Sequence, residues 1–143
     1  MLRNLARRSL QTMVAVLAVA GAGYVSSMVT RARCETFGMQ QIVDAVRLPD
    51  GTTVPVFLLP DHSPRARAAL QRVGLSVQPC LDPPEKFACF PWADVDSKIV
   101  APFVVAVRWE HVAFPTSGAG GEAVFFCLFG ARWPIHERGL WVA

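Results

Sequence analysis

A run of 22 residues without a formally charged side chain, Ser9 to Thr30, constrains the fold of this chain more than any other feature of its sequence. Arginines flank the run on both sides, with Arg3, Arg7 and Arg8 before it and Arg31 and Arg33 after it. As an α-helix rising about 1.5 Å per residue, the run would be about 33 Å long, compared with about 30 Å for the hydrocarbon core of a membrane. The sequence therefore predicts one membrane-spanning helix.

Two other interpretations fit the same N-terminal segment. Secretory signals also have a basic start and an apolar stretch, and Ala18-Val19-Ala20 and Ala20-Gly21-Ala22 are small-residue patterns of the kind that precede cleavage. A mitochondrial import sequence is possible as well, because no acidic residue precedes Glu35. We favour a retained anchor because the uncharged run is longer than a usual signal core. The predicted span includes Ser9, Leu10, Val14, Leu17, Tyr24 and Thr30.

The flanking charges predict an orientation and a division of the chain. Positive charge is slightly greater before the run than after it, which favours an N-terminus on the cytoplasmic or matrix side. Residues 1–34 would then form the anchor, and residues 35–143 would form one small translocated domain. We expect a bacterial inner membrane with the domain in the periplasm, or alternatively a mitochondrial inner membrane.

Charge and length limit what this domain can be. The formal net charge of +3 comes largely from the arginines that flank the span, and charges beyond Glu35 are close to balanced. Because nucleic-acid binding needs a basic patch, the composition predicts no nucleic-acid partner. The residues after the anchor suffice for one compact domain and are too few for two.

The first half of the domain predicts strands and one short helix, in an α+β fold with a mainly antiparallel sheet. Strands are expected at Gln41–Leu48 and Thr53–Leu59, joined by a Pro-Asp-Gly turn. A helix should follow, capped by Ser63 and ended by Gly74, with Ala66, Ala69, Leu70 and Val73 forming its apolar stripe. Leu75–Gln78 can then return as a parallel strand.

The second half predicts two long strands with apolar side chains on both faces. These are Ile99–Phe114 and Glu122–Trp133, linked by a glycine-rich loop at Thr116–Gly121. A strand that is apolar on both sides is normally buried on both sides, and one short helix cannot cover two faces of a sheet. Either the sheet folds over on itself or a partner covers it. The predicted partner-binding residues are Phe126, Leu128, Trp133 and Trp141.

The cysteines suggest one structural bridge. Cys80 and Cys89 enclose a proline-containing loop, and in a translocated domain we expect them to form a disulfide. The alternatives are a reduced pair or a redox-active pair, although reactive pairs usually lie at a helix N-terminus. Cys127, among phenylalanines, is expected in the core.

The remaining polar motifs predict no catalytic residue, metal ligand or cofactor. Asp61, His62 and Ser63 are consecutive, and sequence neighbours rarely converge on one reacting atom. Asp94 and Asp96 resemble the start of a calcium loop that lacks its glycine and its distant acidic ligand. We expect His111 in the core and His136 in an exposed tail.

These observations favour a non-enzymatic, membrane-tethered accessory or assembly subunit of a membrane protein complex. Its partners would be membrane lipid and other subunits, which it would contact through its hydrophobic C-terminal hairpin and tail. A soluble secreted or periplasmic binding module, released by signal cleavage, is the first alternative. A small thiol-dependent enzyme is the second.

Overall fold

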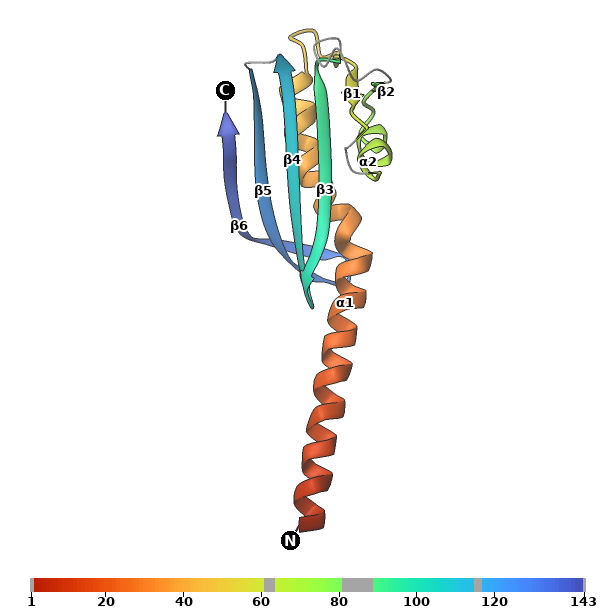
Figure 1. The fold of residues 1–143 in the computed structure, drawn as a ribbon, viewed down its shortest axis with the longest axis vertical. Helices are drawn as coiled ribbons and strands as arrows, with labels where there is room; N and C mark the ends of the chain where they lie inside the picture. The colour runs from red at the N-terminus through yellow and green to blue at the C-terminus, as the bar shows by residue number, and fades with distance from the viewer. Residues whose placement is uncertain (1, 61–63, 81–88, 115–116, 143) are drawn as a thin grey trace.

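The computed structural model describes residues 2–60, 64–80, 89–114 and 117–142. Its six strands form one mixed sheet in the order β2-β1-β3-β4-β5-β6, with one long and one short helix (Figure 1). The α+β prediction is therefore confirmed. The predictions for Asp61, His62 and Ser63 lie outside the described residues. The elements are α1 (Leu2–Val46), β1 (Val56–Leu58), α2 (Ala66–Arg72), β2 (Val77–Pro79), β3 (Trp92–Ala101), β4 (Val104–Phe114), β5 (Ser117–Leu128) and β6 (Ala131–Val142).

Helix α1 is 45 residues long and lies in two different surroundings. Its N-terminal half extends away from the rest of the molecule, while its C-terminal half lies against the sheet (Figure 1). The predicted strand at Gln41–Leu48 is wrong, because the chain stays helical to Val46. Its β-branched residues suggested a strand, but Met39, Ile42, Val43 and Val46 repeat at helical spacing and form one buried stripe.

The segment after α1 follows the predicted turn and parallel pairing. The Asp50 carboxylate accepts hydrogen bonds from the backbone N–H and the hydroxyl of Thr52, and Gly51 has a φ of 84°. These bonds lower the pKa of Asp50. Strands β1 and β2 pair in parallel on either side of α2, as expected, although β1 is only three residues long. Helix α2 ends shortly before Gly74, whose φ is 83°.

Strands β3 to β6 form an antiparallel meander whose turns lie elsewhere than predicted. The predicted strand Ile99–Phe114 includes the end of β3, a turn and β4, and the predicted strand Glu122–Trp133 includes most of β5, a turn and the start of β6. The glycines before Glu122 lie within β5, where the Trp109 indole occupies the space that a Gly121 side chain would need. The predicted tail is the edge strand β6.

The core lies between the sheet and the two helices. Val105, Val107 and Phe125 face the helices and are buried. Phe37 of α1 makes edge contacts with Trp109 and Phe125, with ring centroids 5.4 and 5.5 Å apart. One apolar face of the central strands is therefore covered by the C-terminal half of α1, a cover that the sequence reasoning did not foresee. Among the described residues, no second layer covers the opposite face, which we call the open face.

Candidate functional site

The β3–β4 turn contacts α1 where the helix has a glycine. The Phe103 N–H donates a hydrogen bond to the Gly23 carbonyl at 3.1 Å. A Cβ atom on Gly23 would lie 2.6 Å from Pro102 Cβ, closer than real contacts allow. A Cβ on Gly21, two residues earlier, would meet nothing within 4 Å. The helix is therefore first half-buried at Ala20, and its hydrogen bonds to the hairpins begin at Gly23.

The β5–β6 turn is held by hydroxyl groups of α1. The Ser26 hydroxyl donates to the Cys127 carbonyl at 3.0 Å and accepts from the Phe129 N–H at 2.7 Å. The Thr30 hydroxyl accepts from the Gly130 N–H at 2.9 Å. Both helix side chains are fully buried. Thr30, which was predicted as a span residue, bonds to the turn.

A buried carboxylate fixes α1 to α2 and β3. Glu35 accepts a hydrogen bond from the Ser97 hydroxyl at 2.7 Å and pairs with Arg72 at 2.9 Å. Arg31 Nε and Arg65 Nη1 lie 3.7 and 4.0 Å from the same carboxylate. A buried charge needs such partners to offset its lost hydration. The sequence reasoning missed this cluster, although Glu35 is the first acidic residue and lies four residues after Arg31, one helical turn away.

The N-terminal half of α1 presents apolar side chains on all sides. Leu10, Val14, Leu17 and Tyr24, all predicted span residues, are exposed, and Leu17 reaches 68 %. Ser9 is exposed as well. By length and composition, α1 is the one described helix that could cross a membrane.

The predicted partner-binding residues are only partly brought together. Phe126 is stacked on Phe103 and tilted against Trp133 on the open face, with ring centroids 5.9 and 6.0 Å apart. We call these three rings the open-face stack. Leu128 lies at the end of β5 beside the turn and is exposed. Trp141 pairs with Gly120 at the far end of β6, away from the other three.

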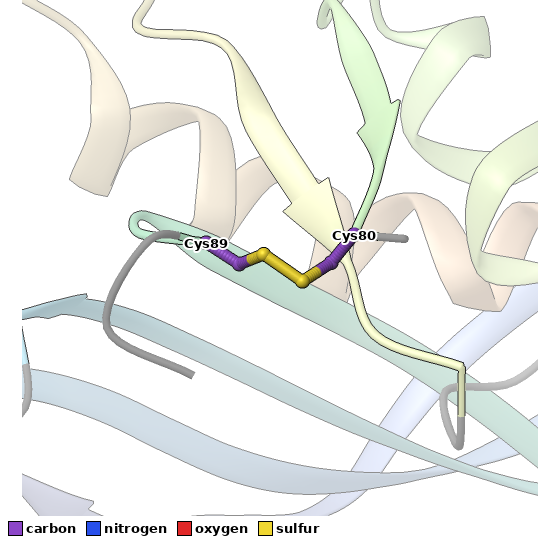
Figure 2. Close-up of a disulfide and its surroundings, with 2 residues drawn as sticks. All are labelled: Cys80 and Cys89. Carbon is purple, nitrogen blue, oxygen red and sulfur yellow. A yellow bond between two sulfur atoms is a disulfide. The ribbon is translucent and has the colours of Figure 1, made fainter. Parts of the chain in front are cut away.

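The two cysteine pairs differ. Cys80 and Cys89 lie at disulfide-bonding distance, with Cα atoms 5.8 Å apart, after β2 and before β3 (Figure 2). Cys34 of α1 and Cys127 of β5 are buried free thiols with sulfurs 3.5 Å apart. Burial raises the pKa of both thiols, that of Cys34 to about 12. Neither free thiol is therefore prepared to act as a thiolate nucleophile.

Other candidate groups have structural positions. His111 is buried, and desolvation lowers its pKa. Asp94 and Asp96 lie in strand β3 rather than in a calcium loop. His136 is exposed on β6. Within the described ranges, no three His, Cys, Asp or Glu residues lie close enough together to hold a metal ion.

Comparisons with family models, with curated proteins and with solved structures found no match to this chain. Its function is therefore inferred from its own geometry.

Proposed function

We propose that this protein is a non-enzymatic accessory or assembly subunit of a membrane protein complex, tethered by α1. The observation that carries the proposal is that α1 is one uninterrupted helix with two environments. Its first half is apolar and bare, and its second half is part of the domain core. A helix of this kind would hold the domain at the membrane without a flexible linker.

The bare half of α1 supports membrane anchoring. Met13, Val16, Leu17 and Val19 are each more than 60 % exposed, on different sides of the helix. A contiguous apolar surface of this kind is normally covered by lipid or protein. The flanking arginines favour a translocated domain, and a disulfide between Cys80 and Cys89 fits an oxidising compartment. We propose the bacterial inner membrane and periplasm as the setting, with the mitochondrial inner membrane as the alternative.

The open face supports docking onto another subunit through the C-terminal hairpin, β5–β6. The open-face stack exposes Phe126 and Trp133, and aromatic residues are enriched at protein interfaces. Strand β6, which includes Trp141, is the edge of the sheet, and an edge strand can pair with a strand of another chain.

The positions of the reactive side chains support a non-enzymatic role. Glu35 is paired with arginines, Cys80 lies at bonding distance from Cys89, and His111 is buried. Glu35 and the Cys80–Cys89 pair are thus engaged within the protein, and we propose no thiol-dependent reaction.

The test is extraction of the full-length protein from its native membranes in mild detergent, followed by sizing. We expect a complex larger than the monomer. Replacing the exposed aromatics (Phe126→Ser with Trp133→Ser) should release a monomer that stays membrane-bound. The control removes an exposed ion pair on the same face (Glu122→Ala with Arg138→Ala) and should keep the complex. A wild-type protein that runs alone as a monomer would contradict the proposal.

One observation favours the soluble binding module as a second candidate. The predicted cleavage patterns end at Ala20 and Ala22, immediately before the first hydrogen bond between α1 and a hairpin, at Gly23. Cleavage there would remove only the bare half of the helix and leave the packed half in place. The intact mass of the native protein separates the two candidates, because the tethered subunit requires that residues 9–22 are retained.

A further inference from the structure

We propose that the turns of the β3–β4 and β5–β6 hairpins insert into the apolar layer of the membrane that α1 crosses. The surface concerned consists of Val100, Phe103, Leu128 and Phe129, which we call the tip surface. The inference rests on the proposed function, because it needs α1 in the membrane. It assigns Leu128, predicted from the sequence as a partner-binding residue, to lipid.

The length of bare helix is the first argument. The fourteen residues from Ser9 to Ala22, which precede the first hydrogen bond to a hairpin at Gly23, cover only about 21 Å at 1.5 Å per residue. A hydrocarbon core of about 30 Å leaves a shortfall of about 9 Å. The next uncharged residues of α1, from Gly23 to about Met28, would make up the missing 9 Å, and they lie beside the turns. If the uncharged run fills the core, then the turns lie within its outer part.

The chemistry of the tip surface is the second argument. Val100, Leu128 and Phe129 are exposed, Phe129 at 62 %, and neither turn segment, 100–104 or 126–130, contains a charged side chain. Beside them, Met28 and Val29 of α1 are also exposed and apolar. The bare surface of the helix therefore continues onto the tips, which lie at the end of the sheet nearest the free half of α1 (Figure 1).

The backbone of the turns is the third argument. In a lipid layer no water is available, so polar backbone groups must be bonded within the protein. The N–H groups of Phe103, Phe129 and Gly130 all donate to atoms of α1. The Gly130 carbonyl accepts from Arg33 at 2.7 Å. These groups are satisfied without water, as insertion would require.

Polar groups begin directly beyond the tips and mark the expected water interface. Arg33 follows the uncharged run on α1, and Arg132 and Trp133 lie at the start of β6. Arginine and tryptophan are the side chains that collect at membrane–water interfaces. Farther from the tips, the open face carries the ion pairs Arg108–Glu110 and Arg138–Glu122. The sheet therefore changes from apolar to charged along its length.

The experiment measures membrane depth in the full-length protein, reconstituted in phosphatidylcholine vesicles that contain nitroxide-labelled lipid. Single cysteines carry an environment-insensitive fluorophore at the tip (Phe129→Cys, and independently Val100→Cys), in the bare helix (Met13→Cys) and at the opposite end of the domain (Leu48→Cys). The native free thiols need not be removed, because both are buried and have raised pKa values. Retained circular dichroism shows that each variant is folded.

We expect lipid-borne nitroxide to remove most of the fluorescence at positions 129, 100 and 13, and little of it at 48. Strong quenching at 13 with none at 129 and 100 would overturn the insertion of the turns while leaving the anchor intact. Absence of quenching at 13 would overturn the anchor and, with it, this inference. Equal quenching at 48 would mean that the whole domain lies in lipid, which also contradicts the inference.

Discussion

The two halves of α1 form one helix, yet their side chains are distributed differently around it. In the first half, apolar side chains face all directions, which is typical of a helix surrounded by lipid. In the second half, Met39 and Ile42 face the sheet while Gln40, Gln41 and Asp44 face outward, which is typical of a helix at the surface of a water-soluble core. Total hydrophobicity therefore predicts that such a helix exists, whereas the periodicity of its apolar side chains shows where its packed half begins.

The boundary between the halves is made by small and hydroxyl-bearing residues. Gly23, Ser26 and Thr30 allow two hairpin turns to approach α1 and bond to it. The following predictions test this division of the helix. In each, domain stability means the free energy of unfolding of the full-length protein in detergent, followed by tryptophan fluorescence in urea.

The largest difference is expected between truncations in the two halves. Ile42 is fully buried, and Ile42→Ala should lower the domain stability by about 2–5 kcal/mol because it leaves a cavity. Leu17→Ala, in the bare half, should change domain stability by less than about 0.5 kcal/mol. Equal effects of the two substitutions would mean that the helix does not have two environments.

The next effect concerns the buried carboxylate that joins the helix to the domain. Glu35→Ala should cost about 2–3 kcal/mol, somewhat less than a fully buried pair, because Arg72 is 49 % exposed and remains hydrated. The matched control is Asp44→Ala, because Asp44 is a carboxylate on the exposed side of α1 and its removal should have little effect on domain stability. If Glu35→Ala left the domain stability unchanged, the cluster would not hold α1 in place.

A smaller effect should locate the boundary itself. Gly23→Ala forces a methyl group against Pro102 and should lower the domain stability by about 1–2 kcal/mol. Gly21→Ala, two residues away in open space, should cause no loss. If both substitutions changed the domain stability equally, the close contact between α1 and the β3–β4 turn would not be specific to Gly23.

The smallest effect depends on pH and concerns His111 of β4, which lies beside the packed half of α1. His111 lines a hollow beside Ala45 and Val46, and burial lowers its pKa in the folded state. The unfolded chain then binds more protons below its ordinary pKa of about 6.5, so stability should fall as the pH drops from 7 to 5, by less than about 1 kcal/mol. His111→Gln should flatten this slope. An unchanged slope would assign it to other groups.

Local patterns in the sequence predicted part of this fold. Four features depend on residues that are close together in sequence, and these were predicted. They are the uncharged run, the Asp50 turn, the helix ended by Gly74 and the parallel return of β2. The extension of α1 to Val46 was missed because Ile42 and Val43 are β-branched and favour strands. Packing against the sheet stabilises the helix there instead. The hairpin turns were missed because Phe103 and Phe129 adopt positive φ without glycine, which only tertiary contacts stabilise.

The site was predicted less completely than the fold. Phe126 and Trp133 were selected together because both are large aromatics in the C-terminal hairpin, and they do meet on the open face. Ser26 and Glu35 were not selected, and Thr30 was selected only as a span residue, because their partners lie about 60 to 100 residues away in sequence. No local pattern encodes contacts of that range.

The unbroken course of α1 from its bare half into the core has a mechanical consequence. A domain on a flexible linker samples many orientations, and its partners must select one of them. If the bare half crosses a membrane, as proposed, any tilt or rotation of that half would turn the sheet by the same angle, so that the bilayer would set the direction in which the aromatic face of the sheet points.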